Sequence, residues 1–193
     1  MIRAVPRWEP DARDRLIRAA LDLFAEQGYD STTVAQIVER AGLTRSTFFR
    51  HFPDKRDVLV AGQQTLSRLL EQGIAAAPPD ASPLQAVTAG LDAALAAFAE
   101  RREFSIKMEA VVAANTELQE RDSLKQAGFA AGISDALQRR GVPEMTARLA
   151  AEMGVVAFHT AHARWTAPGN QREIGELGRE ALDELRAATA LLG

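Results

Sequence analysis

The sequence predicts an all-α fold, and two observations support this. Apolar residues recur at three- and four-residue steps along most of the 193 residues, which is the spacing of an amphipathic helix, and no segment keeps the alternating pattern of a β-strand. Glycines, prolines and hydroxyl residues interrupt these stripes where helices would begin or end. We expect about nine helices in a chain that is long enough to bury a sizeable core.

The first three predicted helices are short and closely spaced. An apolar stripe over 16–24 ends before Gly28, a residue that suits the left-handed conformation often found after a helix. The second helix covers 34–41 and follows a run of hydroxyl residues that can cap it. Thr44 can cap a third helix, which ends at Pro53 because proline disfavours helical geometry in the residue before it.

The next two helices are separated by a clear break. A fourth helix is expected to begin near Asp54 and to run through Leu70, and residues 75–82 then interrupt the helical pattern. Ser82 offers an N-cap oxygen, Gln85 can complete a capping box three residues later, and the proline between them suits a first helical turn. A fifth helix therefore begins directly after Ser82.

Four more helices complete the predicted fold. Three of them cover 103–114, 116–140 and 143–166, and the last follows a turn at 167–170. The helix at 143–166 is apolar on more than one side, which predicts that it is buried on several sides.

The last helix carries two internal glycines, each of which costs about 1 kcal/mol relative to alanine. Such glycines indicate that another helix approaches closely. The close neighbour is either part of the chain's own core or a second subunit. For a homodimer formed through the last two helices, the predicted interface residues are Ile174, Leu177, Gly178, Ala181 and Leu185.

The composition excludes several classes of function. No uncharged apolar run reaches the roughly 18 residues of a membrane span, and the N-terminal residues lack the apolar segment of a signal peptide, so we expect a cytoplasmic protein. The absence of cysteine excludes disulfides, thiolate nucleophiles and cysteine-based zinc sites. His159 and His162 lack an acidic partner at a suitable spacing, so neither a metal nor a cofactor is expected.

The positive charge of the chain is concentrated in one segment. The net charge is −3, whereas a dedicated nucleic-acid binder is often strongly basic. Residues 45–56 nevertheless contain four basic residues and one acidic residue. This charge overlaps the segment AGLTRSTFFRHFPDK at 41–55, in which three phenylalanines alternate with cations.

The same segment has the layout of a helix-turn-helix motif, with two short helices joined by a turn at Gly42. In such a motif the start of the second helix enters the major groove of DNA. Phe48 and Phe52 lie four residues apart and are expected to anchor that helix in the core. The residues expected to reach base edges are Thr44, Arg45, Ser46 and Thr47, and those expected to contact phosphate are His51 and Lys55.

Residues 13–59 resemble the N-terminal domain of TetR-family transcriptional regulators, above all in the segment GYDSTTVAQIVERAGLTRSTFFRHFPDK at 28–55. The shared pattern is a Gly-Tyr pair, a Thr-Thr pair before a hydrophobic helix, an Ala-Gly-hydrophobic-Thr turn, and an aromatic-His-Phe sequence followed by a lysine. The resemblance implies a DNA-binding domain at 1–54 and a helical ligand-binding and dimerisation domain at 55–193.

The resemblance also implies a function. The chain is expected to be a sequence-specific regulator that binds a palindromic operator in double-stranded DNA as a homodimer. A hydrophobic or amphipathic small molecule would release it as a repressor, although an activator would show the same sequence pattern. Further DNA contacts are implied for Thr33 with phosphate, for Arg50, and for Phe49, which keeps the ring but lacks the hydroxyl of the tyrosine common at this position.

An effector cavity is implied among the helices predicted between 83 and 166. Ordinary core packing would place the same side chains in the interior, so both interpretations stay open. The candidate lining residues are Phe98, Phe104, Met108, Val111, Phe129, Phe158, His162 and Trp165.

An enzyme is not expected, because the chain has no phosphate-binding glycine loop, no nucleophile elbow and no paired metal ligands. The acidic balance of the chain leaves open a helical dimer that binds a ligand or a protein without reading DNA.

Overall fold

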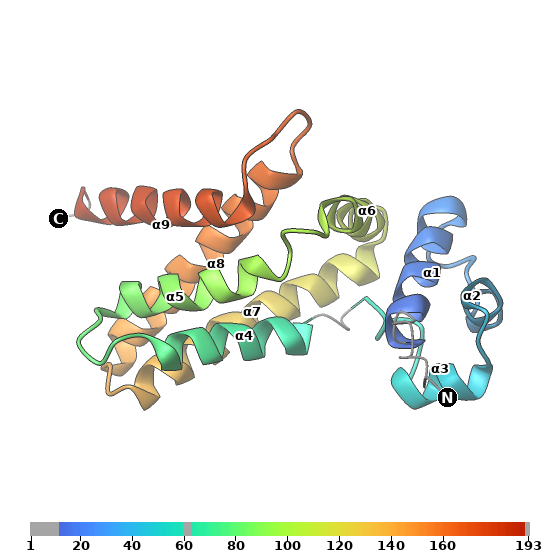
Figure 1. Ribbon diagram of the computed structural model, residues 1–193, viewed down its shortest axis with the longest axis horizontal. Helices are drawn as coiled ribbons and strands as arrows, with labels where there is room; N and C mark the ends of the chain where they lie inside the picture. Colours follow the sequence, from blue (N-terminus) through green and yellow to red (C-terminus); the bar gives the residue numbers. More distant parts are fainter. Residues whose placement is uncertain (1–11, 60–62, 192–193) are drawn as a thin grey trace, which may run out of the picture. The chain divides into compact units, whose positions relative to one another are not determined.

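The computed structural model describes residues 12–59 and 63–191, and every regular element in them is an α-helix, as predicted (Figure 1). Contacts divide the chain into two compact units. The first unit comprises residues up to 62 together with 107–115, and the second comprises 63–106 and 116–193. The two units are therefore described separately.

The first unit contains α1 (Ala12–Gln27), α2 (Val34–Ala41) and α3 (Arg45–His51). Gly28 follows α1 with a φ of 85°, in the left-handed region that glycine adopts without strain. Thr33 caps α2 and forms the reciprocal capping box with Gln36. The three helices bury a common core, whose largest fully buried side chains are Leu16, Leu21, Ile37 and Phe48.

The fourth helix does not begin at Asp54, so that prediction was wrong. Residues 53–59 form bends and turns, and α4 (Gln63–Ala76) begins later. The Asp54 carboxylate accepts the backbone N–H groups of Arg56 at 2.6 Å and Asp57 at 3.3 Å. The Arg56 guanidinium also donates to this carboxylate, at 2.7 Å, and lowers the pKa of Asp54. Similar contacts cap helices elsewhere, but here residues 55–59 form turns, and the N–H of Leu59 donates to the carbonyl oxygen of Arg56, three residues back, at 3.1 Å.

The second unit is built from α4, α5 (Pro83–Ala96), α7 (Thr116–Arg139), α8 (Glu144–Thr166) and α9 (Ile174–Ala190). The division between the units falls within α6 (Arg102–Ala113). In the second unit α5 runs between α4 and α9 and contacts both (Figure 1). The predicted capping box at the start of α5 is confirmed, since the Ser82 N–H donates to the Gln85 side chain at 2.8 Å and the Gln85 N–H donates to the Ser82 hydroxyl at 3.3 Å.

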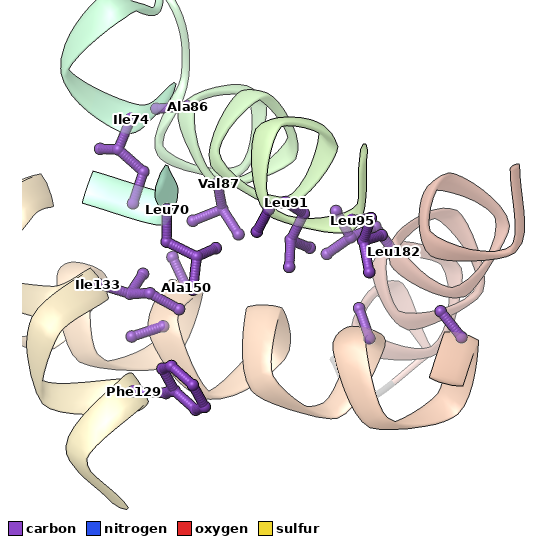
Figure 2. Packing of buried hydrophobic residues seen from close by; sticks show 14 of the residues in the cluster. Leu70, Ile74, Ala86, Val87, Leu91, Leu95, Phe129, Ile133, Ala150 and Leu182 are labelled. Carbon is purple, nitrogen blue, oxygen red and sulfur yellow. The ribbon is translucent and has the colours of Figure 1, made fainter. Parts of the chain in front are cut away.

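The core of the second unit consists mainly of aliphatic side chains from all five of these helices, with the aromatic rings of Phe129 and Trp165. Figure 2 shows how they converge, with residues labelled from α4 (Leu70, Ile74), α5 (Val87, Leu91, Leu95), α7 (Phe129, Ile133), α8 (Ala150) and α9 (Leu182).

Two arginines cap helix ends in the second unit. Arg140 donates to the carbonyl oxygens of Ile74 at 3.1 Å and Ala77 at 2.9 Å, at the end of α4. Arg102 donates to those of Trp165 at 2.8 Å and Ala167 at 2.9 Å, at the end of α8. Because the last carbonyls of a helix have no partner within the helix, these side chains satisfy acceptors that would otherwise need water.

The α8 helix is buried on one face rather than on several sides, which corrects the sequence-based expectation. Its buried face is made largely of alanines and packs against α5, α7 and α9. Its opposite face leaves Met145, Leu149 and Val156 exposed, at 73%, 59% and 46% of their surface. Three apolar side chains are therefore uncovered on the outer face of α8 in the described chain, with the exposed Glu152 between Leu149 and Val156.

Two glycines allow α4 and α5 to pack backbone against backbone. A Cβ added to Gly73 would lie 2.6 Å from the carbonyl oxygen of Ala89 and 2.7 Å from the Cα of Gly90. A Cβ added to Gly90 would lie 2.8 Å from the carbonyl oxygen of Leu70. Because these atoms belong to the backbone, they cannot move aside as a flexible side chain would.

We predict that Gly73→Ala lowers the free energy of unfolding by about 1–3 kcal/mol, because the added methyl group forces α4 and α5 apart. The matched control is Gly175→Ala in α9, where an added Cβ meets no atom within 4 Å. That variant should be unchanged or more stable by up to about 1 kcal/mol. Urea denaturation of the full-length chain measures both, and equal stability of the two variants would contradict the close packing.

Candidate nucleic-acid interface

The short helix α3 is held by two buried phenylalanines. Phe48 is fully buried and Phe52 is 2% exposed, and their ring centroids lie 5.6 Å apart. A helix of seven residues is not stable by itself in water, so its conformation depends on this anchoring. The prediction that Phe48 and Phe52 belong to the core is confirmed.

Both ends of the turn between α2 and α3 are capped. Gly42 has a φ of 62° and its N–H donates to the carbonyl oxygens of Val38 and Glu39 at the end of α2. The Arg15 guanidinium of α1 donates to the carbonyl oxygen of Ala41 at 2.5 Å. The turn is therefore fixed by the backbone of α2 and by a side chain that comes from another helix.

The start of α3 is capped by Thr44. Its hydroxyl accepts the N–H of Thr47 at 3.1 Å, and the two threonine hydroxyl oxygens lie 3.0 Å apart. Arg45 and Ser46 occupy the first turn and are exposed. The four residues predicted to reach base edges thus gather at the leading end of one capped helix.

The exposed face of α3 also carries Phe49 and Arg50. Phe49 is 56% exposed and packs edge-on against Phe48, with the ring centroids 5.4 Å apart. Arg45 and Arg50 form no hydrogen bond or ion pair with any residue that the structure describes. Two unpaired cations and an exposed ring on the same helix are available to an external anionic and partly apolar surface.

Thr33 is exposed at the start of α2, where it caps the helix with its hydroxyl. The hydroxyl accepts the N–H of Gln36 at 3.3 Å, and the Gln36 side chain accepts the N–H of Thr33 at 2.8 Å. The N-terminus of a helix favours an anion, so this position suits a phosphate.

The two remaining predicted phosphate ligands are less accessible. His51 is half-buried, and its Nε2 atom is buried without a hydrogen-bond partner among the described residues. The Lys55 ammonium donates to the carbonyl oxygens of Tyr29 at 2.8 Å and Thr32 at 3.0 Å. Both side chains are therefore turned at least partly into the protein.

Five of the predicted effector residues form one aromatic cluster in the second unit. The ring centroid of Phe158 lies 5.8 Å from that of Phe98, 6.3 Å from that of Phe129 and 6.1 Å from that of His162, on which it stacks. The His162 and Trp165 ring centroids also lie 6.1 Å apart. Five of the eight candidate lining residues thus meet in space, as either an effector cavity or ordinary core packing would require.

The other three predicted effector residues lie on α6. Phe104 belongs to the second unit, whereas Met108 and Val111 fall in the part of α6 assigned to the first unit. Phe104 and Met108 are half-buried, and Val111 is buried. The structure does not bring the eight residues together within one unit.

A groove of about 480 Å³ lies elsewhere in the second unit, beside the start of α5. It contains none of the predicted effector residues. The residues that line it are Ser82, Pro83, Leu84, Gln85, Thr146, Leu149, Ala150, Met153 and Arg186.

The predicted dimer residues on α9 lie mostly inside the chain. Ile174, Leu177 and Ala181 are at most 2% exposed, and a Cβ added to Gly178 would collide with Leu95 of the same chain. Of the five predicted interface residues, Leu185 alone is partly exposed. The expected close approach is confirmed at Gly178, which packs against α5 of its own chain. At Gly175 the described chain brings no atom within 4 Å of an added Cβ.

The described residues contain no group of three or more histidine, aspartate or glutamate side chains that could hold a metal ion. None of the helices at 12–59 and 63–191 has the length and hydropathy needed to cross a bilayer.

Sequence comparison relates the first unit to one family. The model for bacterial regulatory proteins of the tetR family matches residues 16–61. The HTH-type transcriptional regulator TcmR of Streptomyces glaucescens is 40% identical over 83 residues, which are 43% of this chain and 37% of that protein. The match thus spans little more than a third of that relative's own length.

Solved structures resemble this chain over most of its length. FadR of Thermus thermophilus, a transcriptional repressor in complex with lauroyl-CoA, has a TM-score of 0.57 at 23% identity and covers 90% of this chain and 92% of its own. The complex of SmeT with triclosan has a TM-score of 0.65 at 22% identity, with 92% and 90% covered. At these identities the likeness establishes the fold.

Proposed function

We propose that this chain, a member of the tetR family of bacterial regulatory proteins, is a transcriptional regulator that binds a palindromic operator as a homodimer and responds to a small hydrophobic or amphipathic effector. Repression released by the effector is the favoured mode of action, and the cytoplasm is the proposed location. The boundary between a DNA-binding domain at 1–54 and an effector-binding domain at 55–193 stays a prediction.

One observation carries the proposal. Arg45 and Arg50 project from a helix fixed by the buried Phe48, and no described residue satisfies either guanidinium. Stability within the chain does not account for cations left without partners on a rigid helix, whereas the phosphates and base edges of DNA supply acceptors for both.

The residues of α2 and α3 divide by the part of DNA that suits them. Arg45 can make the two-pronged contact with guanine, and Thr44, Ser46 and Thr47 can contact base edges beside it. Thr33 and Arg50 suit phosphates, and His51 would need to reorient before its buried Nε2 could donate to one. The exposed ring of Phe49 suits an apolar contact with deoxyribose or with a thymine methyl group.

The effector proposal rests on the aromatic cluster and on the related structures. Phe98, Phe158, His162 and Trp165 present rings from α8 and from the segment after α5. FadR of Thermus thermophilus binds lauroyl-CoA and SmeT binds triclosan, so an amphipathic thioester and an apolar aromatic compound are the two effector classes to test. To shift the DNA-binding equilibrium, the effector must bind the two states with different affinity.

We place the proposed homodimer interface on the exposed face of α8, because the α9 residues first expected there are mostly buried within the chain. Met145, Leu149 and Val156 form an apolar stripe, and Leu149 also lines the groove beside it. A second copy of the chain can cover the stripe through a twofold contact and place side chains in the groove.

We predict that Arg45→Ala weakens operator binding by about 1–3 kcal/mol and weakens binding to unrelated DNA less, because it removes a contact with a base. Arg50→Ala should weaken binding to both DNAs alike and lower the salt slope by about 1, because a phosphate contact carries no sequence information. Fluorescence anisotropy at several salt concentrations, with the intergenic DNA beside the protein's own gene and a scrambled duplex, measures both effects.

Equal losses for both variants on both DNAs would contradict this division between Arg45 and Arg50. A wild-type protein that shows neither sequence preference nor a salt slope would refute the regulator function itself.

We predict that Phe98→Leu weakens the effect of lauroyl-CoA or triclosan on operator affinity by about threefold to tenfold, because it removes aromatic contacts while conserving volume. Operator affinity without effector should stay at the wild-type value. The control is Ile106→Leu, an exposed apolar residue of α6. The proposal for the cluster fails if both variants respond to the effector as the wild type does.

We predict that Leu149→Glu increases the dissociation constant of the homodimer by about tenfold or more, because it places a carboxylate in an apolar contact. Sedimentation equilibrium over a range of concentrations measures this. Ile106→Glu introduces the same charge at an exposed apolar position outside α8 and should leave association unchanged. An unchanged dimer of the Leu149 variant would remove the stripe from the interface.

A further inference from the structure

Lys55 has the geometry of an internal clamp. Its Nζ lies 2.8 Å from the carbonyl oxygen of Tyr29, 3.0 Å from that of Thr32 and 3.4 Å from that of Asp30. It also lies 4.2 Å from the centre of the Tyr29 ring, within the range of a cation–π contact. Three carbonyl oxygens and one aromatic face thus surround the ammonium group.

An ammonium group has three N–H donors, and the three carbonyl oxygens match that number. A phosphate would have to displace one of these oxygens, or share its N–H, to be bound by Lys55. This differs from Arg50, whose guanidinium has no partner among the described residues. Lys55 and Arg50 therefore have different surroundings.

The loop that Lys55 contacts, residues 29–32, directly precedes α2. It lies between Gly28, with a φ of 85°, and the N-cap Thr33. Within it, Thr32 is 1% exposed and its hydroxyl donates to the carbonyl oxygen of Gly28 at 2.8 Å. Lys55 lies in the turn that follows α3 and donates to this loop. Its contacts therefore fix the start of α2 relative to the end of α3.

We propose that Lys55 is a positioning residue, which holds the loop so that the N-terminus of α2 at Thr33 meets a phosphate, and is not itself the phosphate ligand. This inference rests on the proposed DNA-binding function. It would replace the expectation, drawn from the helix-turn-helix layout and from the family resemblance, that Lys55 contacts a DNA phosphate directly.

The shapes of lysine and arginine distinguish the two roles. A guanidinium is planar, with donors in a rigid fork, and binds phosphate at least as well as an ammonium group. None of its nitrogens carries three N–H donors, so no single nitrogen can serve three carbonyl oxygens as the Lys55 Nζ does at 2.8–3.4 Å. Arginine therefore replaces a lysine that binds phosphate but not a lysine that acts as this clamp.

The experiment compares operator binding by wild type, Lys55→Arg and Lys55→Met at several salt concentrations, with Arg50→Lys as the comparison at a proposed phosphate ligand. For a clamp, both Lys55 variants lose about tenfold or more in operator affinity, and Lys55→Arg keeps the wild-type salt slope. Arg50→Lys should lose affinity but by less than either Lys55 variant, because either cation can meet an exposed phosphate. Near-wild-type binding by Lys55→Arg, with a slope reduced by about 1 in Lys55→Met, would overturn the proposal.

Hydrogen exchange without DNA tests the clamp independently of the proposed function. The clamp predicts faster exchange of the amides at 30–37 in both Lys55 variants. Unfolding of the first unit in either variant would also support the clamp, because a surface phosphate ligand is not needed for folding. A phosphate ligand predicts unchanged exchange, which would overturn the inference. If wild type binds no DNA with sequence preference, the regulator function fails, while the exchange result still decides the role of Lys55.

Discussion

The burial of Phe48 is the interaction on which the proposed DNA reader depends. A helix of seven residues gains too few hydrogen bonds to offset the cost of nucleation, so α3 exists because its apolar side is buried. Burying an aromatic ring contributes several kcal/mol, which is a large share of the stability of a small domain. Once the buried face is fixed, the helical repeat leaves Arg45, Ser46, Phe49 and Arg50 exposed.

Long cationic side chains serve two different purposes in this chain. Arg15, Lys55, Arg102 and Arg140 donate to backbone carbonyls near helix ends or loops, and each joins segments far apart in the sequence. Arg45 and Arg50 have no such acceptor among the described residues. The role of a basic residue therefore depends on which acceptors it meets. A count of charges along the sequence cannot distinguish a residue that holds backbone carbonyls from one that contacts DNA.

Local sequence signals predicted the fold well because the forces behind them are local. Thr44, Ser82 and Gln85 cap helices through atoms three residues away, and Gly28 and Gly42 adopt the left-handed conformation expected after a helix. The predictions that failed depended on more distant or competing contacts. Asp54 was expected to start a helix, but the side chain of Arg56 helps to hold it in a turn, and the partners of Lys55 lie 23–26 residues away.

The glycines of α9 show why the sequence alone could not locate a dimer interface. A glycine inside a helix indicates close approach, yet the sequence does not state which neighbour approaches. In α9, Gly178 meets Leu95 of the same chain, and its neighbours Leu177 and Ala181 are buried with it. In α8 the alanines satisfy the chain's own core, so the larger apolar residues Met145 and Leu149 are left on the outer face. Gly178 and the alanines of α8 therefore serve packing within this chain, and the larger exposed residues are the ones proposed to meet a second copy.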